Sequence, residues 1–472
     1  MQTAIIILSG CIFLTLPYWL PSLVIRLRMF IFTKVNGEEG IQLPNERIGA
    51  SKLKCVYSHK NADGRSRGAE LSNLFWYWLS PAPEIHQEHI EKGEKYDHMS
   101  TVTNDVLSVP TGRIEALAEK CATKVLSEEY TTPWRITRLR DMMMPIWAEF
   151  YYELVFDEEC PEHARQLIVD NANDVIEALK CCSLRHMRKR DRLTQFLVKK
   201  LQAGEFPHQF QGSYSVEERA SFLQGVFFNT AIVQTSEAMA HLLLVVAQHT
   251  EVQEALANNE RDAHYYDMVL TETLRLFPLF GIAHRVTSDD IAVDEQTVIP
   301  SESVVCFNFP EYHQIGYEQP EKFIPERWRN LSKKEANYIP FGVYSNRSCP
   351  AQRIALLSMK KVTQIALKQF EFSSSVAHTR SLPNRGPCFI VIRKYNLSNT
   401  RKRIMLALMR IRDQWEDVYR SILQLFLGTY MVWDARRLRL CDRYFESDEA
   451  SDSVTSSGCP NWVKSKDDYG TD

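Results

Sequence analysis

One cysteine stands in a setting that favours its ionised form. Cys349 follows a loop that contains Gly342, and a run with helical character begins directly after it. A thiol at a helix N-terminus lies near the positive end of the helix dipole and near free backbone N–H groups, which favour the metal-ligating thiolate. Arg347 adds positive charge that could contact an anionic group of a cofactor. Taken alone, the pattern fits a metal ligand and an inert cysteine equally well.

Glu272 and Arg275 form a second signature, because a spacing of three residues places both side chains on one face of a helix. On its own, such a pair is more often a surface salt bridge. The downstream segment Pro-Glu-Lys-Phe-Ile-Pro-Glu-Arg-Trp, residues 320–328, contains Arg327. Since one carboxylate can bind two guanidinium groups, Arg327 could complete a buried network with the pair.

In order and spacing, these motifs resemble those of the cytochrome P450 family, the haem-thiolate monooxygenases, over roughly residues 216–395. The resemblance implies a haem cofactor whose iron is held by a cysteine thiolate, a ligand that favours O–O cleavage. It also implies a folding triad behind the haem and arginines that bind the propionates. The implied metal ligand is Cys349, the triad is Glu272, Arg275 and Arg327, and the remaining cofactor-binding residues are Arg285, Arg347 and Phe341.

The long apolar helix expected over residues 216–249 carries the implied catalytic residues. Thr235 matches the family's hydroxyl that hydrogen-bonds dioxygen, although a buried helical Thr commonly just bonds the carbonyl four residues earlier. Gln234 replaces the acid that passes protons, and Ile232 replaces a Gly that leaves space for dioxygen. These departures predict slow or poorly coupled oxygen activation.

Other departures concern the contacts to the cofactor. The cysteine loop has one extra residue between Phe341 and Arg347. A Trp-x-x-x-Arg motif that would hold the second propionate is not recognisable. Trp134 and Arg138 have the spacing but come too late in the chain, and His98 is a weak substitute. The front of the domain is therefore where the resemblance is poorest.

The whole chain has the composition of a globular protein. It has 472 residues, 44% hydrophobic and 24% charged, and its formal charge of −3 gives no indication of a nucleic-acid partner. Helical patterns dominate, with short strands expected at residues 291–298 and 303–309, and no βαβ alternation occurs. We therefore expect a mainly α fold with small β-sheets, a single large domain of the cytochrome P450 type.

Residues 2–25 contain no charged side chain and, as a helix, would span about 36 Å, enough to cross a bilayer core of about 30 Å. Arg26, Arg28 and Lys34 follow directly. The positive-inside rule then predicts a single-pass anchor over residues 1–34 with the catalytic domain in the cytosol, most simply at the endoplasmic reticulum. The alternative is a cleaved signal peptide.

Beyond the P450-like domain, expected at residues 35–397, apolar residues recur at spacings of four and three. This stripe predicts an amphipathic helix over residues 398–445, which either packs on the domain or faces a membrane or a partner helix. Residues 446–472 are acidic and Ser-rich, and we expect them to be disordered. The stripe consists of Ile404, Leu408, Ile411, Trp415, Val418, Ile422 and Leu425.

Three functions follow from the resemblance. The first is a membrane-bound monooxygenase that inserts one oxygen atom of dioxygen into an apolar small molecule or lipid, with electrons from an NADPH-dependent reductase. The second is an isomerase, dehydratase or peroxygenase acting on oxygenated lipids, which needs no proton relay for dioxygen. The third is a non-catalytic haem-binding membrane protein.

Overall fold

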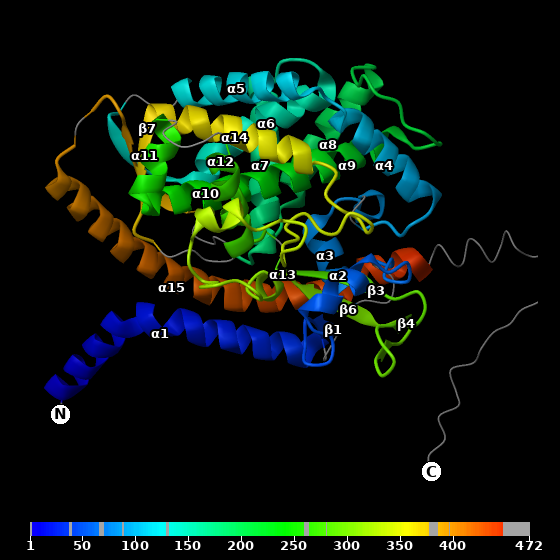
Figure 1. Cartoon of the computed structure of the whole chain (residues 1–472), viewed down its shortest axis with the longest axis horizontal. Coiled ribbons are helices and arrows are strands. Elements are labelled where there is room, and N and C mark those ends of the chain that lie inside the picture. The colour runs from blue at the N-terminus through cyan, green and yellow to red at the C-terminus, as the bar shows by residue number, and fades with distance from the viewer. Residues whose placement is uncertain are drawn as a thin grey trace, which may run out of the picture.

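The computed structural model describes residues 2–36, 40–65, 70–86, 89–128, 132–258, 264–279, 281–376, 386–395 and 397–446. Helices form most of this structure, as expected (Figure 1). The expected tail, from residue 447 on, lies outside the described residues. The helices are α1 (Gln2–Asn36), α2 (Ala50–Ser58), α3 (Glu70–Leu79), η1 (Pro83–Ile85), α4 (Glu94–Leu107), α5 (Thr111–Glu128), α6 (Leu139–Phe156), α7 (Glu162–Leu179), α8 (Met187–Gln202), α9 (Val216–Leu223), η2 (Gln224–Ala231), α10 (Ile232–Gln248), α11 (Thr250–Asn258), α12 (Tyr265–Leu276), α13 (Phe309–Tyr312), η3 (Pro325–Arg329), α14 (Gln352–Gln369) and α15 (Asn399–Leu438).

Three small sheets accompany the helices. The first has the order β1-β6-β3, with β1 parallel and β3 antiparallel to β6, and Arg285 opposite Val305 in the register. Its edge strand β1 has only three residues, too few to show a strand pattern in the sequence. The strands are β1 (Ile41–Leu43), β2 (Trp134–Arg138), β3 (Ile282–Val286), β4 (Ile291–Ala292), β5 (Val298–Ile299), β6 (Val304–Asn308), β7 (Phe370–Ser373) and β8 (Pro387–Ile392).

The core is built around the expected long helix, which runs continuously as α9, η2 and α10. Its middle part, η2, is π-helical, a geometry that often marks functional sites. Helix α6 packs along α10, and α14 lies against α5 (Figure 1). Helix α6 is buried on nearly all sides, because neighbouring helices cover it.

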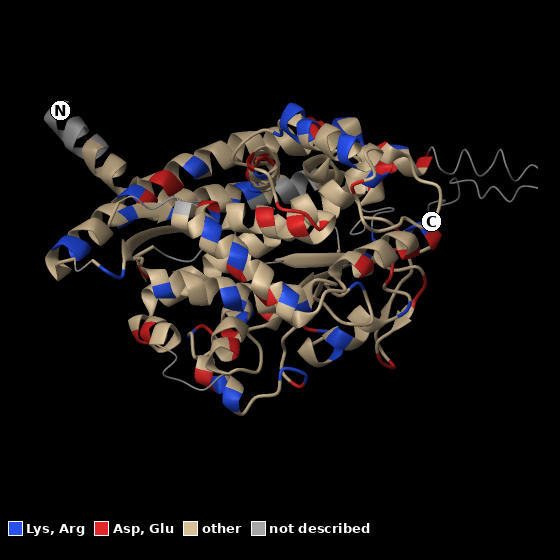
Figure 2. Cartoon of the chain, turned by 90° about the horizontal axis from the view of Figure 1, so that it is seen from above, with Lys and Arg blue, Asp and Glu red and all other residues tan. Residues whose placement is uncertain are grey.

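Charged residues of both signs are interspersed over the helices (Figure 2). Residues 185–192 form a basic run, a pattern typical of a solvated helix face. One of its arginines does not face solvent. Arg190 is fully buried, and its Nε lies 2.6 Å from the carboxylate of Asp174. Its guanidinium also donates to the backbone carbonyl of Ser80, at 2.7 Å, so it links α8 to the segment after α3.

Candidate active site

The cysteine loop is held in place by backbone and amide hydrogen bonds. The Cys349 N–H donates to the carbonyl of Phe341 at 2.9 Å, and α14 begins three residues after the cysteine. Asn346 is buried and donates to the carbonyls of Tyr57, at 2.8 Å, and of Ala62. At the tip of the loop, Tyr344 is 94% exposed. The base of the loop, which carries the thiol, is therefore fixed to the domain while its tip projects into solvent.

The thiol opens into the main internal cavity, and the structure brings most of the expected residues to it. Thr235 and Gln234 line the cavity from α10, Arg285 from β3, and Phe341 and Arg347 from the cysteine loop. Most other lining residues are apolar or aromatic, as in small-molecule sites generally. They include Phe75, Val226, Phe227, Leu274, Leu279, Ile282 and Phe309.

Glu272 and Arg275 do not line the cavity. They lie behind it, where both side chains are fully buried. Arg275 binds the carboxylate of Glu272 through two hydrogen bonds of 2.9 Å. Arg327 Nε donates to the same carboxylate at 3.0 Å, and Trp328 Nε1 does so at 2.8 Å. The backbone N–H of Ile324 adds a fifth bond. The carboxylate is thus satisfied without water.

On α10, the hydroxyl of Thr235 makes the bond that is common for a buried helical Thr. It donates to the carbonyl of Ala231 at 2.6 Å. Ile232 is fully buried and does not line the cavity, so it does not take up the space its sequence position suggested. Glu237 points elsewhere and pairs with Arg140 at 2.6 Å. Gln234 is therefore the polar residue next to Thr235 on α10 that faces the cavity.

The donor set fits the haem that the resemblance implies. Three guanidinium groups line the cavity, those of Arg65, Arg285 and Arg347, and none of its described lining residues is Asp or Glu. The Arg285 Nε is buried and has no hydrogen-bond partner among the described residues. Its two other nitrogens donate to the Tyr57 hydroxyl and the His284 carbonyl. A cavity with a thiol and excess positive charge suits a dianionic metal cofactor.

Several cavity residues were not found from the sequence. Arg65, Tyr96, His86 and Tyr151 lie in segments that carry no recognisable motif. Tyr96 is on α4, and the Arg347 guanidinium lies over its ring at 4.7 Å. No sequence signal marks these residues, because each reaches the cavity only through contacts between segments far apart in the chain.

The residues that were considered for the Trp-x-x-x-Arg motif, or as a substitute for it, lie away from the cavity. Arg138 pairs with Glu416 at 2.8 Å, and Trp134 is on the edge strand β2. His98 Nδ1 lies 3.0 Å from the Tyr214 hydroxyl. None of the three is among the residues that line the cavity.

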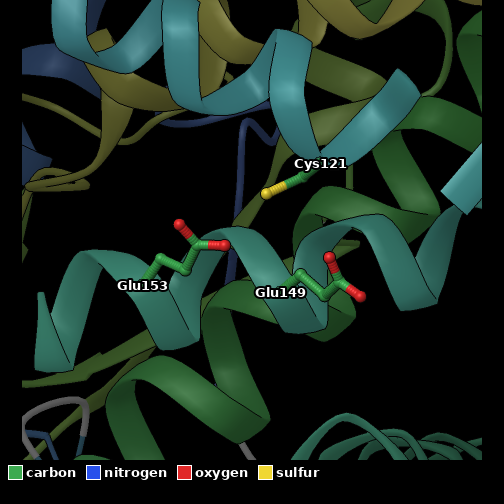
Figure 3. Close-up of side chains that lie close together, drawn as sticks. All are labelled: Cys121, Glu149 and Glu153. Atoms are coloured by element: carbon green, nitrogen blue, oxygen red, sulfur yellow. The ribbon is translucent and has the colours of Figure 1, made fainter. Parts of the chain in front are cut away.

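A second cluster with metal-ligand chemistry lies between α5 and α6. Cys121, Glu149 and Glu153 bring their ligand atoms within 4.8 Å of one another (Figure 3). Lys120 binds Glu153 at 2.8 Å, and Arg165 binds Glu149 at 2.7 Å. Burial raises the pKa of the Cys121 thiol far above its usual range. The cluster is therefore a charge-balanced ion network with a protonated thiol.

Comparisons with known proteins agree with this site. The cytochrome P450 family model matches residues 158–398, a little over half of the chain. Cytochrome P450 3A12 of Canis lupus familiaris is 32% identical over 168 residues, which cover 31% of this chain and 33% of the dog protein. Cytochrome P450 3A9 of Rattus norvegicus is 31% identical with the same coverage. The match spans about a third of these relatives.

Solved structures show the same fold. Retinoic acid bound cyanobacterial CYP120A1 aligns with a TM-score of 0.59 at 17% identity, over 73% of this chain and 88% of that one. Cytochrome P450SP alpha (CYP152B1) in complex with (R)-ibuprophen aligns with a TM-score of 0.59 at 16% identity, over 70% and 86%. The family match and the shared fold together show that the protein belongs to the cytochrome P450 family, whose fold implies haem with an axial cysteine thiolate.

Proposed function

We propose that the protein is a membrane-anchored haem-thiolate monooxygenase that inserts one oxygen atom of dioxygen into an apolar small molecule or lipid. The observation that carries this proposal is one cavity lined by Cys349, by the arginines Arg285 and Arg347, and by Thr235. Haem bound there would supply the oxygen chemistry, and its electrons would come from an NADPH-dependent reductase.

The chain's own residues would then have distinct tasks. Cys349 would ligate the iron, and Arg285 and Arg347 would bind the propionates. The Glu272 network ties the backbone at Ile324 to α12 and would keep the elements behind the cavity rigid. The Thr235 hydroxyl, which donates to the Ala231 carbonyl in the structure, would turn from that carbonyl to donate a hydrogen bond into the cavity. The apolar lining would hold substrate and exclude water, which strengthens polar interactions inside.

A second function is favoured by one specific observation. Gln234 is the cavity-facing neighbour of Thr235, and the described lining residues include no carboxylate. An amide cannot pass protons as a carboxylate does. An isomerase, dehydratase or peroxygenase that acts on an oxygenated lipid receives its oxygen with the substrate, and so needs no such relay.

The reduced, carbon-monoxide-bound absorption spectrum tests the haem-thiolate assignment, since only a thiolate-bound haem gives the strongly red-shifted band. Turnover with NADPH and reductase supports the monooxygenase. Turnover with a lipid hydroperoxide alone supports the second function. The thiolate spectrum without either turnover identifies a non-catalytic haem-binding protein and contradicts both.

We also propose the arrangement in the membrane: an anchor at residues 1–34, a haem domain at 35–397, and a helical extension at 398–445, with the domain in the cytosol at the endoplasmic reticulum. In support, α1 contains an apolar stretch, Gly10–Arg28, long enough to cross a bilayer. Arg26 and Arg28 lie at its domain-proximal end. Protease added to intact microsomes should digest the domain, whereas protection of the full-length chain would place it in the lumen.

A further inference from the structure

We propose that α15 is a membrane-surface helix whose outer face lies in the headgroup region of an anionic lipid bilayer. Helix α1 packs along α15 from Phe13 to Arg28, so in this arrangement α1 lies in the same surface and anchors the chain without crossing the bilayer. The inference concerns the C-terminal extension and is independent of the reaction catalysed at the cavity. Figure 1 shows α15 running along one side of the domain, with α1 next to it.

The first observation is that an apolar stripe of α15 faces outward. Of the stripe expected from the sequence, Ile404, Leu408, Ile411 and Ile422 are all exposed. Further along the helix, the outer face continues with large aromatic residues. Its most prominent members are Ile404, Leu408, Phe426, Tyr430 and Trp433, each between 46% and 68% exposed. Four of the seven stripe residues therefore face outward, which favours the second of the two expected arrangements, a helix that faces a membrane or a partner.

The second observation is that the inner side of α15 is fixed to the domain by buried apolar residues such as Met431 and by specific polar contacts. Glu416 accepts a hydrogen bond from Arg138 at 2.8 Å. Gln424 donates to the carbonyl of Lys180 at 2.8 Å. Such bonds fix the rotation of the helix about its axis. The outward direction of the apolar stripe is thus built into the fold.

The acidic and basic side chains of α15 also lie on different sides of the helix. Its four acids lie on the inner or lateral side, and Asp413 and Asp434 are buried. The charged residues of the helix that are exposed are all basic: Arg401, Arg403, Arg410, Arg412 and Arg437. An apolar face bordered by arginines is typical of helices that lie in the interface of anionic membranes. A protein partner would not require this exclusion of exposed acids.

The third observation is that the face continues onto α1. The rings of Phe13 and Trp415 lie 4.7 Å apart, and Arg28 donates to Gln424 at 3.1 Å, so the helices run parallel. Of the 23 exposed large hydrophobic side chains in the described part of the chain, 17 lie on these two helices. A contiguous apolar surface of this extent marks a membrane or protein interface.

Nitroxide labels on single introduced cysteines test the proposal in the full-length holoprotein. In a background with the exposed Cys11 and Cys55 and the C-terminal Cys459 changed to Ser, one label at a time would be placed at Ile422→Cys, Phe426→Cys or Tyr344→Cys. Tyr344, on the cysteine loop, is the water-exposed control. Each variant is used only if its carbon-monoxide spectrum matches that of the background. The protein is reconstituted in phosphatidylcholine vesicles that contain phosphatidylserine.

Oxygen concentrates in lipid, whereas a nickel chelate stays in water. At positions 422 and 426, the ratio of the collision rate with oxygen to the collision rate with the nickel chelate should therefore be several-fold higher than at position 344. Equal ratios at all three positions would overturn the proposal. So would dipolar broadening between labels at 426, which would identify a second copy of the chain as the occupant. Changing both Arg410 and Arg412 to Gln should reduce lipid exposure of a label at Leu408→Cys in the anionic vesicles. No change there would refute the role of the basic border.

Discussion

The hydroxyl of Tyr151 lies 3.1 Å from the hydroxyl of Thr235. Since Thr235 donates its proton to the Ala231 carbonyl, Tyr151 is the donor in this pair. Burial raises the pKa of Tyr151 well above its usual range, so the phenol stays protonated. A buried phenol from α6 therefore fixes the orientation of the one hydroxyl that α10 presents beside Gln234.

Tyr151→Phe should loosen this arrangement without opening a large cavity. Without the phenol, the Thr235 hydroxyl loses the hydrogen bond that it accepts from Tyr151, so the Thr235 side chain can rotate. We expect more hydrogen peroxide released per NADPH consumed, with little change in substrate affinity. The measurement is the ratio of product to NADPH in both proteins. Unchanged coupling would show that Thr235 is held by Ala231 alone.

Gln234→Glu should improve coupling if the protein is a monooxygenase, because it restores an ionisable group beside Thr235. It should leave turnover unchanged if the substrate already carries the oxygen. Gln234→Leu, which removes polarity at nearly the same size, is the matched control. Tight coupling in the unchanged protein would contradict the idea of an impaired relay.

Cys349→His should remove the red-shifted carbon-monoxide band together with oxygenase activity, since imidazole does not donate electron density as a thiolate does. Cys388→Ser, at another buried cysteine, serves as a control that should keep the band. A band that survives in Cys349→His would mean that another residue ligates the iron.

Glu272→Ala should destabilise the fold by about 3–5 kcal/mol, because it leaves buried arginines without a counter-charge. We expect little haem-loaded protein from this variant and from Arg275→Ala. The exposed pair of Arg113 and Asp157 provides the comparison, and Arg113→Ala should cost about 0–1 kcal/mol. Chemical denaturation and haem content measure both effects. Normal haem content in the Glu272 variant would show that the network is dispensable.

The sequence by itself indicated the fold class and the local motifs of the site. Cys349, Glu272, Arg275 and Arg327 were found because each belongs to a short segment whose residue types are set by local chemistry. The geometry of Glu272 and Arg275 is decided by helical spacing, so three residues of sequence suffice to predict that they meet. The long helix through Thr235 was likewise readable from its uninterrupted apolar run.

The tertiary structure decided what depends on contacts between distant segments. Arg65, Tyr96 and Tyr151 reach the cavity from three different elements, and no local pattern distinguishes them from other buried residues. The periodicity of residues 404–425 showed that α15 has an apolar side but could not show which way it faces. That direction is set by Arg138, Lys180 and Arg28, which bind its inner side from elements far away in the chain. Amphipathicity is a property of one helix, whereas its orientation is a property of the surfaces around it.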